Sequence, residues 1–391
     1  MRLLKSIALY AVVLALAPLA ILEITLRFLP VSYPPHLTPV TPQDPVARFV
    51  PNVEYRYSAG PDFAIRTLKR TNNYGYHHYA DYDPRDRSPL LMVIGDSFVE
   101  AQAIDKGKTS AELLHAQVQG KGRAYSIGVS GAPLSQYLVF AQYASRTFRP
   151  DALAIVIIGN DFDESLLKYK TEPRFHYFEE RDGKLALKRV DYELSGTKKI
   201  LRQSAFLRYL MYNLQAEHRL PALVGRAGPR TYAELPRAGL ETRVRDSERA
   251  VDYFFERLPE MSGLEPAAVA FVLDAVRPWI YSEAGLKEAE HGYHARLRRY
   301  FAAQARALGY EVIDMQPVFI ARHRADGARF EFPTDSHWNE LGHRMVAEAL
   351  AQSSVFARVF GDRGLVRARN EPPPVAPKGL GAAAEVQSGK L

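Results

Sequence analysis

The sequence predicts an α/β fold: a three-layer α/β/α sandwich built on a parallel, flavodoxin-like sheet of five strands. Five short apolar runs occur along the chain, and segments with a helical spacing of apolar residues separate them. Parallel strands need a long crossover connection, most often a helix, so this alternation favours a parallel sheet covered on both faces. Ligand sites in such sheets lie at the carboxyl ends of the strands. Several of the apolar runs end there in glycine and polar residues.

The predicted strands are short, and each predicted helix has an apolar face. Strands are expected at residues 90–94, 124–127, 152–158, 267–273 and 310–313. Helices are expected at about 108–119, 133–148, 284–308 and 339–352. In the last of these, the residues that share one face are Leu341, Met345, Val346 and Ala349.

The N-terminus indicates a targeting segment at residues 1–29. Arg2 and Lys5 precede an uncharged stretch at residues 6–22, which is at the short end for crossing a bilayer. A cleaved signal peptide is the rival interpretation, but Pro18 would directly follow the cleavage site. We therefore expect a single-pass membrane helix, and the positive-inside rule places the rest of the chain on the periplasmic side.

Other segments flank or interrupt the predicted domain, which we expect to span residues 89–357. Residues 30–88 are expected to form a proline-rich linker followed by an N-terminal extension with short β-like pieces. The alternation stops at about 163–262, where we expect an insertion with a hairpin at Asp182-Gly183 and two amphipathic helices near 198–217 and 244–258. This insertion is either a lid over the strand ends or a helical side layer. The tail at 358–391 is expected to be disordered.

The composition narrows the class of protein. The 391 residues include no cysteine, which excludes disulfides and cysteine-based metal sites. The net charge is +7, but the basic residues are scattered, so a solvated basic surface is favoured over a nucleic-acid site. The sequence has neither a phosphate-binding loop nor a dinucleotide fingerprint. We therefore expect no cofactor, no metal and no nucleic-acid partner.

Four polar blocks follow predicted strands. They are Gly95-Asp96-Ser97, then Gly128-Val129-Ser130-Gly131, then Gly159-Asn160-Asp161, and finally Asp335-Ser336-His337-Trp338. Because the carboxyl ends of parallel strands meet at one edge of a sheet, residues far apart in sequence are expected to converge there.

These four blocks, in this order, resemble the SGNH (GDSL) hydrolase family over about residues 90–352. The resemblance implies a serine hydrolase in which Ser97, Asp335 and His337 form the catalytic triad. It also implies an oxyanion hole made by Ser97, Gly131 and Asn160.

One spacing departs from most of that family. The aspartate usually stands three residues before the histidine, a position that Thr334 occupies here, and Asp335 is two before. The Asp-x-His-Trp form is similar to the branch that contains periplasmic polysaccharide O-acetyltransferases, such as those acting on alginate. In that branch the serine follows the Asp/His pair, whereas Ser97 precedes it.

The chemistry of these residue types agrees with the implied roles. A serine hydroxyl needs a general base, and an imidazole has a suitable pKa. A carboxylate such as that of Asp335 holds the imidazole tautomer and stabilises the imidazolium. Fixed donors stabilise the oxyanion, and a glycine at position 131 leaves the backbone N–H open to the substrate.

Each candidate also has a purely structural interpretation. Ser97 could cap a helix, Asn160 could close a turn, and Asp335 could cap the last helix, although Asn339 is better placed for that task. The pair His291 and His294 lacks the spacing of a hydrolytic zinc site, and His343 is expected to be structural.

The predicted function is ester hydrolysis through an acyl-Ser97 intermediate, with short acyl groups such as acetyl as substrates, including acylated carbohydrates. The first alternative is an O-acetyltransferase that modifies an extracytoplasmic polysaccharide or glycolipid, which would require a separate membrane protein to deliver the acyl donor. The second alternative is a non-catalytic binding or assembly module.

Overall fold

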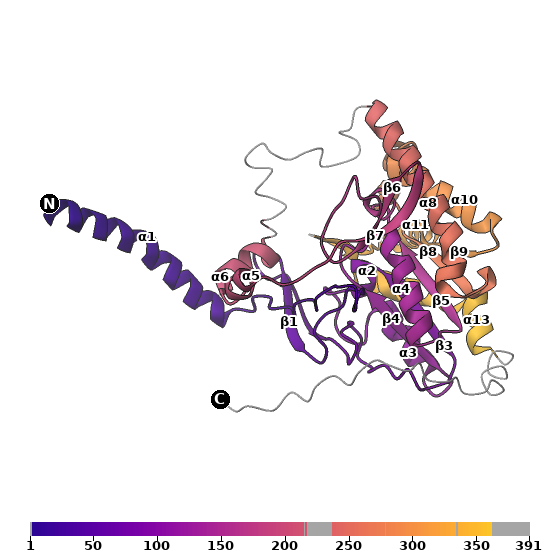
Figure 1. Cartoon of the computed structure of the whole chain (residues 1–391), viewed down its shortest axis with the longest axis horizontal. Helices are drawn as coiled ribbons and strands as arrows, with labels where there is room; N and C mark the ends of the chain where they lie inside the picture. The colour runs from indigo at the N-terminus through magenta and orange to yellow at the C-terminus, as the bar shows by residue number, and fades with distance from the viewer. Residues whose placement is uncertain (1, 215, 217–236, 278, 334, 362–391) are drawn as a thin grey trace.

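The centre of the molecule is a parallel sheet of five strands, in the order β4-β3-β5-β8-β9 (Figure 1). In this computed structural model the described residues are 2–214, 216, 237–277, 279–333 and 335–361. Numbered along the chain, the strand order is 2-1-3-4-5, the flavodoxin-like arrangement. The apolar runs predicted all five strands, which are β3 (Leu90–Gly95), β4 (Arg123–Gly128), β5 (Ala152–Ile157), β8 (Val269–Leu273) and β9 (Glu311–Asp314).

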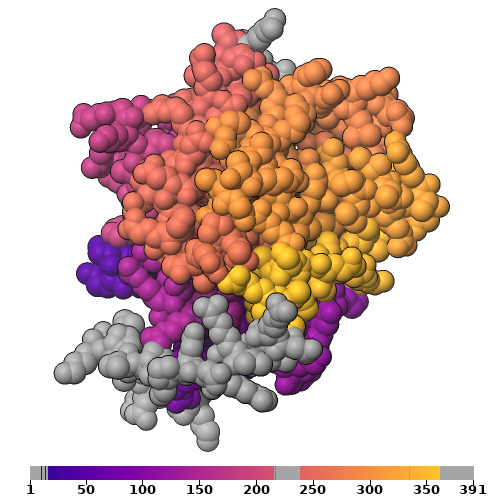
Figure 2. All heavy atoms as spheres, turned by 90° about the vertical axis from the view of Figure 1, so that its right-hand side faces the viewer, coloured from indigo at the N-terminus to yellow at the C-terminus, as the bar shows by residue number. Residues whose placement is uncertain are grey.

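Both faces of the sheet are buried. Along β3, Met92 and Ile94 pack into one apolar cluster, while Leu91 and Val93 pack into another on the opposite face. The first cluster includes side chains of α4 (Leu134–Thr147), α8 (Arg237–Ser262) and α10 (Tyr293–Ala307). The second includes side chains of α3 (Ser110–Val118), α11 (Met315–Asp326), α12 (Glu340–Ala351) and α13 (Ser354–Phe360). Figure 2 shows the face formed mainly by residues from about 240 to 361.

Two predicted helices are interrupted in the structure. The helix expected at 284–308 is divided into α9 (Glu283–Ala289) and α10, because Gly292 takes an extended conformation and caps α10. The segment expected at 198–217 forms α5 (Gly196–Leu201), α6 (Ala205–Arg208) and a short π-helical turn at Tyr209–Asn213. Ser204 separates α5 from α6, since its side chain accepts the Leu207 N–H and begins a new helix.

Three two-stranded sheets surround the central one. The expected hairpin in the insertion forms β6 (His176–Arg181) and β7 (Lys184–Arg189), with positive φ angles at Asp182 and Gly183. The N-terminal extension contributes β1 (Glu54–Ala59) and β2 (Ile65–Arg70). A small pair near the end of the domain joins β10 (Glu331–Phe332) to β11 (Asp335–Trp338).

The N-terminal extension packs closely against the domain. The proline-rich stretch has little regular secondary structure, yet Leu37 and Val40 are buried in the main apolar cluster. Tyr57 of β1 packs with Phe332 and Ala103, close to the carboxyl edge of the sheet. The extension is therefore part of the structure that surrounds this edge.

Helix α1 (Arg2–Phe28) projects from the body, and its C-terminal end lies beside α5 and α6 (Figure 1). The Glu23 carboxylate accepts hydrogen bonds from the Ala205 N–H at 3.0 Å and the Phe206 N–H at 2.8 Å, which attaches α1 to the start of α6. Among the described residues no helix is both long and apolar enough to cross a membrane, so the predicted membrane-spanning helix is not supported.

Two predictions fall largely outside the described residues: the disordered tail, of which only residues 358–361 are described, and the part of the insertion at 217–236.

Candidate active site

Ser97 stands at the carboxyl end of β3, at the start of the one-turn helix α2 (Ser97–Glu100). The residue that caps this helix is Asp96, whose Oδ1 accepts the Phe98 N–H at 2.9 Å. The Ser97 hydroxyl is therefore not used as a helix cap.

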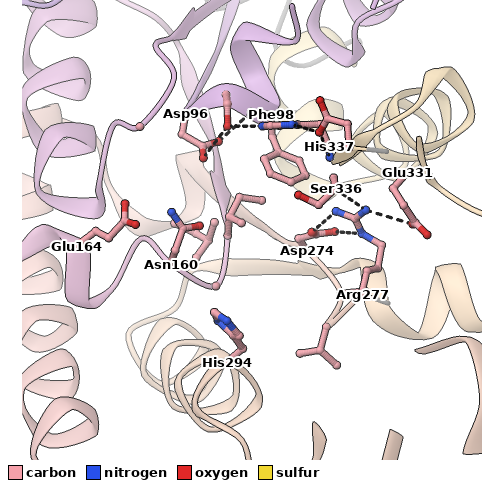
Figure 3. A pocket seen from close by; sticks show the side chains of 18 of the residues that line it. Asp96, Phe98, Asn160, Glu164, Asp274, Arg277, His294, Glu331, Ser336 and His337 are labelled. Carbon is pink, nitrogen blue, oxygen red and sulfur yellow. Dashed lines mark hydrogen bonds and ion pairs between the residues drawn. The ribbon is translucent and has the colours of Figure 1, made fainter. Parts of the chain in front are cut away.

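His337 and Asp335 lie next to Ser97, although 238 residues or more separate them from it in sequence. His337 Nε2 is 2.7 Å from Ser97 Oγ, and His337 Nδ1 is hydrogen-bonded to Asp335 Oδ1. The same carboxylate oxygen accepts the His337 N–H at 2.9 Å. Figure 3 shows His337 at one side of the cavity, with dashed lines for the interactions drawn there. The cap of α12 is Asn339, so Asp335 is free for the histidine.

The electrostatics of this row favour a charged Asp335 beside a basic imidazole. Burial alone would lower the pKa of His337, but the hydrogen bond and charge of Asp335 outweigh it and raise that pKa above 6.5. Burial raises the pKa of Asp335, and the hydrogen bond to His337 more than offsets it, so that this pKa ends below its usual value. About a third of the His337 side chain is exposed (35%), so the imidazole remains accessible from the cavity.

Two glycines of the second block, Gly128 and Gly131, lie near α2 or along the cavity that Ser97 lines. A Cβ at Gly128 would lie 2.6 Å from the Glu100 N, so only glycine allows β4 to end this close to α2. Gly131 has a φ of +81°, a conformation that side chains rarely adopt. It lines the same cavity as Ser97. Both positions therefore depend on the absence of a side chain.

The third block forms a tight turn after β5. The buried Asp161 carboxylate accepts the Ile158 N–H at 2.7 Å and the Tyr137 hydroxyl at 3.0 Å. Burial, followed by the charge of Asp96, raises the pKa of Asp161 well above its usual range. Asn160 lies at the tip of this turn, and its side chain lines the cavity between Glu164 and Phe98 (Figure 3).

The cavity that joins these blocks has a volume of about 1640 Å³, and both charged and apolar side chains line it. One wall comes from the insertion, which contributes Lys170, Glu172 and Arg174. The Lys170 Nζ donates to the Gly131 carbonyl at 2.9 Å and pairs with Glu164 at 2.6 Å. The insertion therefore has two structural parts. Helix α8 belongs to a helical layer, and the segment around residue 170 borders the cavity.

A side chain that the sequence did not reveal, Arg277, holds the loop that carries His337. Arg277, beyond the end of β8, donates to the Ser336 carbonyl at 2.8 Å and pairs with Asp274 at 2.7 Å (Figure 3). Asp274 in turn accepts the Trp338 indole N–H at 2.8 Å. Backbone or side-chain contacts therefore hold both neighbours of His337, and no local sequence pattern marks this arrangement.

Arg277→Lys is expected to lower kcat by about 10- to 100-fold, because a lysine cannot reproduce the forked contacts and the loop that carries His337 would shift. The measurement is steady-state hydrolysis of an acetyl ester, with folding monitored by circular dichroism. A folded R277K protein that keeps the wild-type kcat would remove Arg277 from this role.

Two other histidines, His343 and His294, lie in different environments. His343 is buried and accepts the Ser110 N–H at 3.2 Å, and burial lowers its pKa to about 3, so it is a neutral core residue. His294 lines the cavity below Asn160 (Figure 3). In the described part of the chain, no three His, Asp or Glu side chains are grouped so that they could hold a metal ion.

Comparison with known proteins gives one match at the level of families. Residues 246–377 match the family described as SGNH hydrolase-like domain, acetyltransferase AlgX. This range contains Asp335 and His337 but not Ser97. No curated protein matches the chain.

Several solved structures are similar to the chain at low sequence identity. A lipolytic G-D-S-L family protein from Veillonella parvula is 14% identical, with 69% of this chain and 100% of that chain covered, at a TM-score of 0.36. An acetyl xylan esterase is 12% identical, with 67% and 97% covered and a TM-score of 0.37. A lipase from a goat rumen metagenome is 12% identical, with 70% and 99% covered and a TM-score of 0.39.

The family match, together with the Gly-Asp-Ser, Gly-Asn-Asp and Asp-x-His blocks, relates this chain to the SGNH (GDSL) hydrolases.

Proposed function

We propose that this protein hydrolyses short acyl esters, acetyl esters above all, through an acyl-Ser97 intermediate. The observation that carries the proposal is the continuous row from Ser97 through His337 to Asp335, in which His337 Nε2 lies 2.7 Å from Ser97 Oγ. A serine becomes nucleophilic when a base of this kind can take its proton.

In the first half of the reaction, Ser97 Oγ attacks the ester carbonyl carbon while its proton moves to His337 Nε2. The tetrahedral intermediate then collapses, the bond to the alcohol oxygen breaks, and His337 returns the proton to the departing alcohol. In the second half, His337 takes a proton from water, which attacks the acyl-serine carbonyl. The acid is released and Ser97 regains its proton.

The negative oxygen of each tetrahedral intermediate needs donors that are already in place. We assign this role to the backbone N–H groups of Ser97 and Gly131 and to the side-chain amide of Asn160. All three residues line the cavity, and each follows a different strand of the sheet.

Asn160→Ala is expected to lower kcat by about 10²- to 10³-fold with little change in KM, since one oxyanion donor is lost. Folding should be unaffected, because Asp161 rather than Asn160 closes the turn. The measurement is the steady-state rate on a p-nitrophenyl acetate series. A kcat within threefold of the wild type would exclude Asn160 from the oxyanion site.

An O-acetyltransferase is the second candidate, and two observations favour it: the description of the matched family and the size of the cavity. The acyl-Ser97 intermediate would be the same, but a sugar hydroxyl would take the place of water. Such an acceptor needs more room than water, and a volume of about 1640 Å³ provides it.

One experiment separates these candidates. The protein is incubated with p-nitrophenyl acetate, with and without alginate as a polymeric acceptor, and free acetate and polymer-bound acetyl groups are measured. Free acetate equal to the released nitrophenol in both reactions supports hydrolysis, whereas acetylated polymer supports transfer. Release no faster than in Ser97→Ala would favour a non-catalytic module.

A further inference from the structure

Glu100 links the helix that carries Ser97 to the loop that carries Gly131. Helix α2 has a single turn, with Ser97 at its first position and Glu100 at its last. The Glu100 side chain is almost completely buried, and its Oε2 accepts the N–H of Ser130, the residue before Gly131. One carboxylate therefore spans the gap between these two parts of the site.

The other carboxylate oxygen, Oε1, accepts a hydrogen bond from the Gln102 side-chain amide, and side chains of the N-terminal extension pack beside it. His77 Nδ1 lies 3.6 Å from Glu100 Oε1, and His77 Nε2 is 2.7 Å from the Tyr55 hydroxyl. Burial lowers the pKa of His77 well below its usual value, so the imidazole is neutral. Lys69 donates to the Ala101 carbonyl at 3.0 Å and thereby also holds the residue that follows α2.

A buried carboxylate is a costly way to fill this space. Burial raises the pKa of Glu100, which reflects the loss of hydration of its charged form. Apolar side chains of similar volume often stabilise a fold at least as well as buried charged groups. A gain in fold stability therefore does not account for an acidic side chain at this place. The acidic side chain is instead explained by the need for an acceptor oxygen that reaches the Ser130 N–H.

We propose that Glu100 is a positioning residue that fixes the Gly131 N–H relative to Ser97, with Tyr55 and His77 closing the space behind it. This inference rests on the proposed function, because Gly131 matters only if an oxyanion forms. The position of the loop depends on the length of the Glu100 side chain, because an oxygen must lie within hydrogen-bond distance of the Ser130 N–H. It depends less on the charge of that side chain.

Two variants separate reach from charge. Glu100→Gln keeps one acceptor oxygen at the same reach and removes the charge. Its NH₂ group replaces the oxygen that accepts from Gln102, and the Gln102 amide can turn over to present its own oxygen instead. We therefore expect kcat within about threefold of the wild type. Glu100→Asp keeps the charge but shortens the side chain by one methylene, so the loop carrying Gly131 would shift. We expect E100D to lower kcat by about 10- to 100-fold with KM within twofold. Rates are measured with p-nitrophenyl acetate well below each midpoint of thermal unfolding.

Glu112→Asp is the matched control. Glu112 is also a buried carboxylate that accepts backbone N–H groups, those of Tyr79 at 2.8 Å and Gly107 at 3.0 Å, and it does not line the cavity. We expect E112D to lower the unfolding temperature while kcat stays at the wild-type value. A drop of kcat in E112D that equals the drop in E100D would show a general effect of destabilisation and overturn the proposal.

The other outcomes are equally decisive. Wild-type kcat in E100D, or a loss in E100Q as large as that in E100D, overturns the proposal. If E100D does not fold, Tyr55→Phe replaces it, since it removes one oxygen and leaves the ring. In Y55F we expect a severalfold lower kcat at unchanged KM, and an unchanged kcat contradicts the proposal.

Labelling with a fluorophosphonate distinguishes failure of this inference from failure of the proposed function. In that reaction the Ser97 Oγ–phosphorus bond forms, the phosphorus–fluorine bond breaks, fluoride leaves and His337 takes the hydroxyl proton. A wild-type protein that is neither labelled at Ser97 nor active on the ester would refute the proposed function. A wild-type protein labelled at Ser97, with E100D labelled at the same rate, would refute only the role of Glu100.

Discussion

Ser97→Ala is expected to abolish ester hydrolysis and to leave the fold intact. The loss in kcat should reach about 10⁴- to 10⁶-fold, because the nucleophile and its base act as a unit and neither replaces the other. Among the described residues, the hydroxyl is hydrogen-bonded to His337 Nε2 at 2.7 Å and to the Asp96 carboxylate at 3.3 Å. Its removal leaves a histidine nitrogen that water in the cavity can still reach, so the free energy of unfolding should change by about 1 kcal/mol or less.

The measurement compares acetate release by the two proteins at equal concentration, with mass spectrometry of the acylated chain. The wild type should carry one acetyl group on the peptide that contains Ser97, and S97A should carry none. Ser195→Ala is a suitable control, because Ser195 is an exposed helix cap in the insertion, away from the cavity. Full activity in S97A, or an acetylated peptide elsewhere in the chain, would contradict the assignment of the nucleophile.

The apolar pattern predicted the sheet well because a strand that is buried on both faces is apolar along its whole length. All six residues of β5 are buried, so an unbroken apolar run marks the strand without any knowledge of its neighbours. The strand ends then placed Ser97, Gly131 and Asn160 at the same edge, since parallel strands leave no other arrangement. Asp335 and His337 were predicted from a resemblance in spacing, and the structure places them beside Ser97.

What the sequence did not reveal depends on contacts between distant segments. Arg277 holds the Ser336 carbonyl across 59 residues of sequence, and neither residue has a local pattern that predicts the other. Glu100 stands in a short helix, where an acidic residue usually faces solvent, and its burial follows from the packing of the N-terminal extension over α2. Proline-rich composition predicted a linker at the start of residues 30–88, but composition does not indicate that Leu37 and Val40 are buried in the main apolar cluster.

Asp335→Asn is expected to lower kcat by about 10⁴-fold, an effect larger than that of any single oxyanion donor. Asn has nearly the same shape as Asp, so the loop should remain in place. Its amide can donate to His337 Nδ1, which would leave the proton on Nε2. In that tautomer the imidazole cannot accept the Ser97 proton.

The same substitution should move the pH profile in a defined direction. His337 must be neutral to act as a base, so activity appears as the pH rises through its pKa, which Asp335 raises above 6.5. Loss of the Asp335 charge lowers that pKa, so the acidic limb of kcat/KM should shift to lower pH in D335N. The measurement is kcat/KM on an acetyl ester from about pH 5 to 9, with the residual rate of D335N corrected for uncatalysed hydrolysis.

Arg277→Met is expected to shift the acidic limb of the pH profile in the opposite direction. The Arg277 charge lowers the pKa of His337, so its removal should move the acidic limb of kcat/KM to higher pH, whatever it does to the absolute rate. Opposite shifts in D335N and R277M require that one titrating group, placed between these two charges, controls the reaction. Shifts in the same direction, or an acidic limb that stays in place in D335N, would mean that His337 is not that group. The base would then have to be sought elsewhere in the cavity.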